Sequence, residues 1–150
     1  MKLIKNIFYL TFPILLGIIV ALITQGSFDY QSLTKPPLSP PAIVFPIVWT
    51  ILYILMGISY FLYKNNDDTE KKVDIIYYLQ LFINVTWTII FFTLKLRFLA
   101  IIWTLTLVIL VYTLITLYLQ KYKLSGYLQI PYLVWCIFAT YLTIGVYLLN

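Results

Sequence analysis

Aromatic and amide side chains recur at helical spacing in three apolar stretches of the sequence. An amide in the middle of such a stretch should face the interior of a helix bundle, because an unpaired polar group facing lipid is costly. Indole and phenol rings on the same face suit a flat, largely apolar ligand. The three aligned faces are Trp49, Tyr53 and Tyr60, then Gln80, Asn84, Trp87 and Phe91, then Tyr132, Trp135, Ala139 and Thr143. We therefore expect a ligand pocket between helices.

Packing and interfacial anchoring are the competing explanations for these rings. Trp and Tyr gather where a membrane meets water, and we predict that role for the tyrosines nearest the ends of the stretches. Trp49 and Trp135 lie further inside on faces with polar groups, so both packing and a pocket stay open for them. The tyrosines predicted to form the belts are Tyr9, Tyr63, Tyr77, Tyr118, Tyr122, Tyr127 and Tyr147.

Groups for acid-base or metal chemistry are missing from the apolar stretches. The chain has no histidine, and its five acidic residues all lie in polar segments or at the end of a stretch. We therefore predict no catalytic acid or base, no metal site, no cofactor and no proton relay. Tryptophan is oxidisable and absorbs near-ultraviolet light, so Trp49 and Trp135 are the candidates if the protein acts photo-oxidatively. Cys136, the single cysteine, is expected to be inert packing.

The elements that must position these faces are membrane-spanning helices. Hydrophobic residues make up 63% of the 150 residues, and only 10% are charged, against about 25% in a soluble domain. A span needs about 20 apolar residues. We predict a single-domain, all-α membrane protein with five transmembrane helices. The expected spans are 5–24, 42–63, 73–94, 98–119 and 127–149, the first of them retained rather than cleaved as a signal peptide.

The basic residues predict the orientation of the chain. Seven lysines fall on the amino-terminal side (Lys2, Lys5, Lys64, Lys71, Lys72, Lys121 and Lys123), against Lys35, Lys95 and Arg97 on the other. The positive-inside rule then places the amino terminus in the cytoplasm and the carboxyl terminus outside. The net charge of +5 forms no basic stripe, so we expect no nucleic-acid partner. The Ile, Lys and Asn content indicates a bacterial source. We therefore expect the protein in the bacterial cell membrane.

The first connection, residues 25–41, is rich in proline. Four of the seven residues in Lys35–Pro41 are proline, which fixes φ and removes a hydrogen-bond donor, so this stretch should be stiff and extended. Two interpretations of this stretch remain: it simply ends the first helix before the second begins, or it forms a lid over the outer mouth of the bundle.

Several motifs together resemble the translocator protein family, whose members are also called tryptophan-rich sensory proteins or peripheral benzodiazepine receptors. The matching pieces cover nearly the whole chain in order. They are LTKP at 33–36 with Pro40 and Pro41, VWTILY at 48–53 with Met56 and Gly57, Gln80, Leu81, Asn84, Trp87, Phe91 and Phe92 in the third span, and PYLVW at 131–135 with FATYL at 138–142 in the fifth.

The resemblance implies a five-helix bundle, commonly a homodimer, with the first loop closing over a pocket. It implies binding of porphyrins such as protoporphyrin IX, and of isoquinoline carboxamide and benzodiazepine ligands. Tyr132 is added to the residues that the motifs imply, because it lies on the aligned face of the fifth span. The expected ligand-binding residues are then Tyr30, Pro40, Trp49, Tyr53, Asn84, Trp87, Tyr132, Trp135 and Ala139. Light-dependent porphyrin breakdown and facilitated transport of an apolar ligand are the alternative functions.

This chain departs from the family pattern at three places. Leu38 stands where tryptophan is usual, and Thr143 stands where many members have asparagine. The tail after Tyr147 lacks the Lys or Arg of the sterol-recognition pattern, so we expect weak or no specific cholesterol binding.

Overall fold

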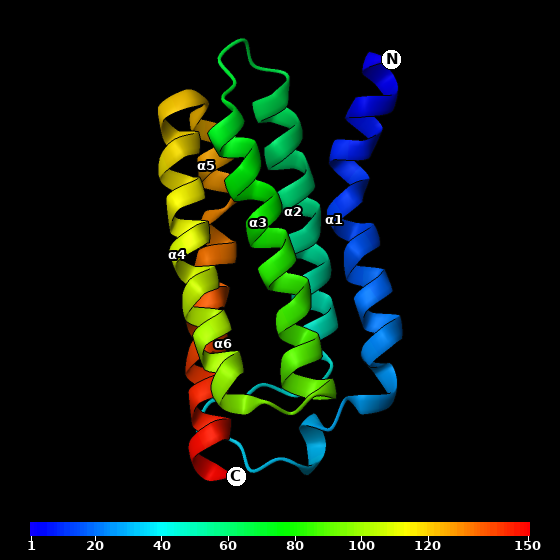
Figure 1. Ribbon diagram of the computed structural model, residues 1–150, viewed down its shortest axis with the longest axis vertical. Coiled ribbons are helices and arrows are strands. Elements are labelled where there is room, and N and C mark those ends of the chain that lie inside the picture. The colour runs from blue at the N-terminus through cyan, green and yellow to red at the C-terminus, as the bar shows by residue number, and fades with distance from the viewer.

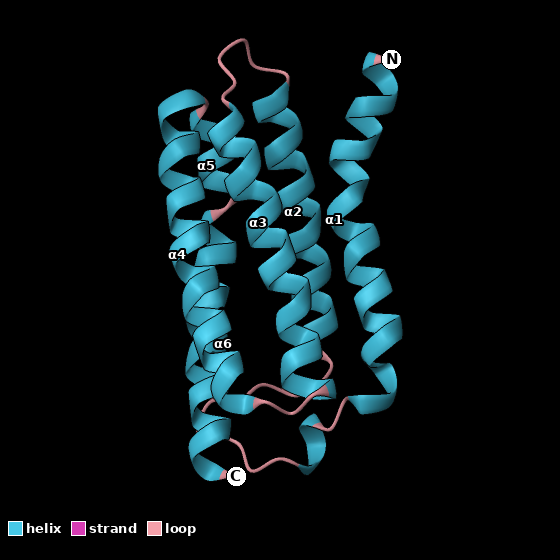
Figure 2. Cartoon of the chain, viewed as in Figure 1, coloured by secondary structure: helices cyan, strands magenta, loops and turns pink.

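The computed structural model describes residues 1–150 and is built of helices without strands (Figures 1 and 2). Five stretches are long and apolar enough to cross a membrane, which confirms the predicted all-α membrane fold. The helices are α1 (Lys2–Thr24), α2 (Val44–Lys64), α3 (Lys71–Thr88), α4 (Arg97–Lys121), α5 (Lys123–Leu128) and α6 (Ile130–Leu149).

The fifth span differs most from its expected bounds, because it begins at Lys123 and is divided into α5 and α6 at Gln129. Pro131 lies in the first turn of α6. Proline has no amide hydrogen for a bond to the carbonyl four residues earlier, so the helix is interrupted here and starts again. The two pieces together still form one continuous crossing of the bundle.

The helices pack in an order that leaves α1 at one side. Helix α1 packs mainly on α2, α2 also contacts α5, and α4 lies against α3, α5 and α6. Figure 1 shows the two termini at opposite ends of the bundle. The connection between α2 and α3 lies at the amino-terminal end, and the first connection runs across the other end.

Tyrosines form much of the core near the amino-terminal end. Tyr63, Tyr77 and Tyr118 are at most 1% exposed, so the interfacial belt predicted for them is wrong. The rings of Tyr60 and Tyr77 stack with centroids 3.8 Å apart, and the Tyr60 hydroxyl donates to Asp74 Oδ1 at 2.8 Å. The rings are buried by stacking in the interior, while polar groups near the helix ends accept hydrogen bonds from some of the hydroxyls. Tyr122, Tyr127 and Tyr147 are exposed, as a belt requires.

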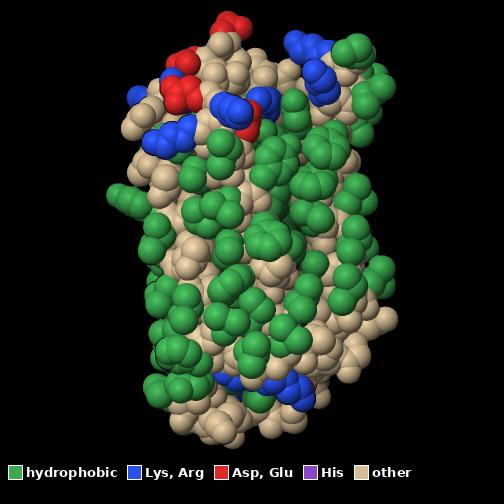
Figure 3. All heavy atoms as spheres, viewed as in Figure 1, with side chains coloured by type: hydrophobic (Ala, Val, Ile, Leu, Met, Phe, Trp, Pro, Cys, Tyr) green, Lys and Arg blue, Asp and Glu red, His purple; other side chains and the backbone are tan.

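The surface has the pattern of an integral, multi-pass membrane protein. Figure 3 shows hydrophobic side chains over the middle of the molecule and charged side chains at its two ends. Ion pairs join Lys64 to Asp74 at 2.9 Å at one end and Arg97 to Asp29 at 3.0 Å at the other. Charges therefore lie where water and lipid headgroups can solvate them.

The proline-rich connection, residues 25–43, is folded across the end of the bundle as a lid. The lid is fastened to α6, because Tyr141 donates to the carbonyl of Pro37 at 2.6 Å and a Cβ on Gly145 would lie 2.5 Å from Pro36 Cβ. The side chain of Asn150 accepts from the Thr34 amide at 3.0 Å and donates to the Thr34 carbonyl at 2.8 Å. Of the two possibilities left open by the prolines, the structure shows the lid.

Candidate ligand-binding cavity

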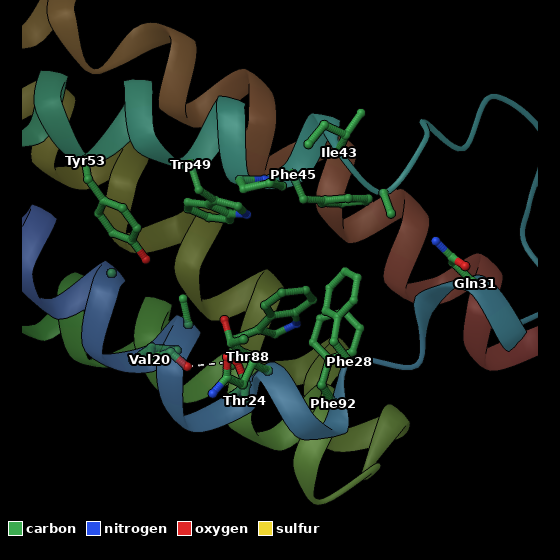
Figure 4. Close-up of a pocket in the computed structure, with 16 residues that line it drawn as sticks. Val20, Thr24, Phe28, Gln31, Ile43, Phe45, Trp49, Tyr53, Thr88 and Phe92 are labelled. Carbon is green, nitrogen blue, oxygen red and sulfur yellow. Dashed lines mark hydrogen bonds between the residues drawn. The ribbon is translucent and has the colours of Figure 1, made fainter.

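A cavity of about 640 Å³ lies between α1, α2, α3 and the lid (Figure 4). Its volume is in the range of about 300–1,000 Å³ that holds small-molecule ligands. Its lining comes from α1 and the turn after it (Gly17, Val20, Ala21, Thr24, Gln25), the lid and the start of α2 (Phe28, Gln31, Ala42, Ile43, Phe45, Pro46), α2 itself (Trp49, Tyr53) and α3 with its last turn (Trp87, Thr88, Phe92).

Helix α2 contributes an aromatic wall made by residues four apart. Phe45, Trp49 and Tyr53 follow one another along the face of α2 that borders the cavity (Figure 4). The rings of Trp49 and Tyr53 have centroids 5.6 Å apart. Gly17 of α1 makes room for Tyr53, because a Cβ there would lie 2.5 Å from Tyr53 Cε2.

The opposite wall depends on an irregular turn at the end of α3. Residues Ile89–Thr93 form a π-helical turn. In a regular α-helix, residues five apart point about 140° away from each other, and a π turn reduces that angle. Trp87 and Phe92 consequently both reach the cavity, with ring centroids 6.2 Å apart. Figure 4 shows Phe92, Phe28, Thr88 and Thr24 across open space from the α2 wall.

A chain of buried hydrogen bonds supports the α2 wall from behind. The Tyr53 hydroxyl donates to Asn84 Oδ1, Asn84 Nδ2 donates to the Tyr132 hydroxyl, and Tyr132 donates to Gln80 Oε1, each at 2.7 Å. Asn84 and Tyr132 are outside the cavity lining and at most 2% exposed. Asn84, which we expected among the ligand-binding residues, holds in place the wall against which a ligand would lie.

The lid covers one end of the cavity and adds a second, smaller space. Phe28 and Gln31 line the main cavity, while Tyr30, Ala139 and Thr143 border the smaller one. The hydroxyl of Tyr30 donates to the carbonyl of Pro40 at 2.7 Å. Burial raises the pKa of Tyr30 above its usual value, so the hydroxyl keeps the proton that makes this bond.

The nine ligand-binding residues predicted from the sequence do not all line one cavity. Trp49, Tyr53 and Trp87 line the main cavity, and Tyr30 and Ala139 line the smaller space. The other four stand back from the main cavity: Pro40, Asn84, Tyr132 and Trp135. The ring of Trp135 packs edge-to-face on Phe45 at 5.9 Å, so Phe45 and not Trp135 forms that part of the cavity wall.

Sequence reasoning missed several residues of the cavity. Phe45 precedes Trp49 by four residues and Thr88 follows Asn84 by four, so an extension of each aligned face would have found them. The residues of α1, including Gly17, Val20 and Thr24, had no such signal. Their stretch is apolar all round and gives no sign of which side meets the other helices.

The two substitutions in the family pattern have different surroundings. Leu38 is 86% exposed at the tip of the lid with φ at 66°, away from the cavity. Thr143 is buried beside the smaller space, and its hydroxyl donates to the carbonyl of Ala139 at 2.7 Å. Neither residue places a side chain in the main cavity.

The cavity has the chemistry of a binding site. No charged side chain is among its lining residues, and no group of His, Cys, Asp or Glu in the structure is placed to hold a metal ion. Facing aromatic rings offer stacking and burial to a flat ligand.

Comparison with known proteins agrees with this architecture. The chain matches the TspO/MBR family over residues 9–148. It is 34% identical to the tryptophan-rich protein TspO of Archaeoglobus fulgidus over 81% of this chain and 79% of the relative. It is 31% identical to a tryptophan-rich sensory protein of Cereibacter sphaeroides over 81% of this chain and 76% of the relative.

A eukaryotic relative extends the same likeness. The translocator protein homolog of Schizosaccharomyces pombe is 33% identical, with 81% of this chain and 77% of the relative aligned. The match over residues 9–148 includes the lid and all or most of each of the five spans. The chain is therefore a member of the TspO/MBR family.

Proposed function

We propose that this protein is a membrane receptor or sensor whose cavity binds a porphyrin or a similarly flat, apolar ligand. The single observation that supports this most strongly is the uncharged cavity of about 640 Å³ with aromatic rings on two facing walls. A tetrapyrrole offers a broad π face, which such rings bury and stack against. The names of the relatives, which include a tryptophan-rich sensory protein, favour a receptor role.

Titration with protoporphyrin IX in the dark tests the proposal. We expect saturable binding to the purified protein, followed by the shift of the porphyrin absorption band. Trp49→Phe should weaken binding about tenfold, because it removes part of the ring that borders the cavity.

Trp103→Phe is the matched control. Trp103 lies outside the cavity, and its Nε1 donates to Thr86 Oγ1 at 2.9 Å. Its replacement should leave porphyrin affinity within about twofold of wild type. Equal affinity of wild type and the Trp49→Phe variant would exclude this cavity as the porphyrin site.

Light-dependent breakdown of the bound porphyrin is a second candidate function. Trp49 favours it, because this oxidisable ring lines the cavity where it would touch the ligand. Illumination of the same sample in air should then bleach the porphyrin faster than in protein-free solution. We expect Trp49→Phe to slow the bleaching more than Trp135→Phe, since Phe45 separates Trp135 from the cavity. Protein that only protects the porphyrin from light would rule out this activity.

A further inference from the structure

The threonine hydroxyls of the α-helices follow one rule with a single exception. Ten threonines in the helices donate to a carbonyl of their own helix three or four residues earlier, as helical threonines usually do. The hydroxyl of Thr88, the last residue of α3, makes no hydrogen bond with another protein group, and Thr88 lines the cavity. A hydroxyl in an apolar pocket gains free energy when a ligand supplies its partner.

Some of the other polar groups of the cavity have a hydrogen-bond partner in the protein, and others have none. Thr24 donates to the carbonyl of Val20 at 2.8 Å, and Tyr53 donates to Asn84 at 2.7 Å. Gln25 and Gln31 are exposed residues of the lid itself. Within the cavity, that leaves three groups without a protein partner: Thr88 Oγ1 and Trp87 Nε1 from the end of α3, and Trp49 Nε1 from α2. Figure 4 shows Thr88 and Trp49 on facing walls.

The three free groups have one requirement in common. An indole N–H can only donate a hydrogen bond, whereas a hydroxyl can donate or accept. A ligand oxygen that accepts a hydrogen bond can satisfy any one of them. No Lys or Arg lines the cavity, so a carboxylate held against Thr88 would be a buried and unpaired charge, which is strongly unfavourable. An uncharged carbonyl oxygen avoids that penalty.

We propose that Thr88 is a specificity-determining residue, and that its hydroxyl donates to an uncharged carbonyl oxygen on the flat ligand. This inference rests on the proposed function, because it assigns a ligand class to the same cavity. Asn84 does not take this role, since both its amide oxygen and its amide nitrogen are engaged with the neighbouring tyrosines.

Two porphyrins and three variants test the role of Thr88. Protoporphyrin IX dimethyl ester has ester carbonyls, and etioporphyrin has only alkyl substituents on the same macrocycle. Each is titrated in the dark into wild type, Thr88→Val, Thr88→Ser and Thr50→Val, and the ratio of the two dissociation constants is compared. Valine keeps the shape of threonine without its hydroxyl, and thermal unfolding checks that each variant is folded.

We expect Thr88→Val to lower the preference for the ester about fivefold, the size expected for one neutral hydrogen bond. Thr88→Ser, which restores a hydroxyl, should recover most of that preference. Thr50→Val should keep it, because Thr50 lies outside the cavity lining and its hydroxyl bonds to the carbonyl of Pro46 in its own helix.

The outcomes separate the two proposals. An ester preference that is the same in wild type and Thr88→Val would overturn the role of Thr88, while binding that depends on Trp49 would leave the porphyrin site standing. Failure of both porphyrins to bind wild-type protein would overturn both proposals.

Discussion

At the scale of single residues, the cavity depends on polar groups that a ligand would never touch. Tyr53 is the only member of the hydrogen-bonded chain that lines the cavity, and the remaining members lie behind it. Tyr132 is the central link, because it accepts from Asn84 and donates to Gln80. In a bundle surrounded by lipid, these bonds are what holds the buried amides in fixed positions.

Removal of the Tyr132 hydroxyl should destabilise the protein more than removal of the Tyr53 hydroxyl. Tyr132→Phe breaks two hydrogen bonds and leaves buried amide groups of Asn84 and Gln80 without partners, whereas Tyr53→Phe breaks one. We expect losses of about 2 kcal/mol and about 1 kcal/mol in the free energy of unfolding.

Unfolding by denaturant in detergent or lipid measures both losses, and Tyr112→Phe is the control because Tyr112 is 60% exposed and makes no side-chain hydrogen bond. Equal stability of the Tyr53→Phe and Tyr132→Phe variants would show that Tyr132 is not the central link of this hydrogen-bonded chain.

At the scale of the elements, α1 is positioned chiefly by its contact with α2. Gly57 of α2 sits directly against the backbone of Leu10, and Gly17 of α1 sits against the ring of Tyr53. Small residues at helix contacts let backbones approach closely in membranes, where apolar side chains gain little by leaving lipid. These two glycines therefore set how near α1 comes to α2, and with it the width of the cavity.

Replacement of Gly57 by alanine should push α1 away from α2. The added Cβ would meet the carbonyl oxygen of Leu10, a backbone atom that cannot rotate aside. We expect a loss of about 2 kcal/mol in stability, typical of overpacking, together with weaker porphyrin binding. Gly26→Ala is the control, because nothing lies within 4 Å of its added Cβ. A Gly57→Ala variant as stable as the control would contradict the tight α1–α2 contact.

At the scale of the whole molecule, charges are divided between the two ends of an apolar body (Figure 3). The lid lies at the end that has fewer Lys and Arg residues in its connections. Short loops rich in Lys and Arg tend to stay in the cytoplasm. The proposed orientation consequently places the lid, and the end of the cavity that it covers, on the outside.

Labelling of single introduced cysteines checks this orientation. Leu38→Cys in the lid should react with a membrane-impermeant maleimide in intact cells, because the position is 86% exposed. Thr69→Cys, in the exposed connection between α2 and α3, should react only after the cells are opened. The native Cys136 is 2% exposed and serves as the unlabelled background. The reverse pattern would place the lid in the cytoplasm.

The sequence alone was enough to predict the five spans and the faces of α2 and α3 that contribute to the cavity. Hydropathy is a local property, so a run of about 20 apolar residues defines a span regardless of its neighbours. Trp49, Tyr53 and Trp87 were predicted because polar and aromatic residues at helical spacing mark an inward face.

Only the tertiary structure decided which predicted residues reach the cavity. It showed that Phe45 stands between Trp135 and the cavity, that Asn84 is engaged with tyrosines, and that Tyr63 belongs to the core. It also brought the small residues of α1 to the cavity wall. The physical reason is that lipid-facing and interior-facing residues are both apolar in a membrane protein. Hydropathy therefore cannot fix the rotation of a helix about its axis or the choice of its neighbours, and packing between helices determines both.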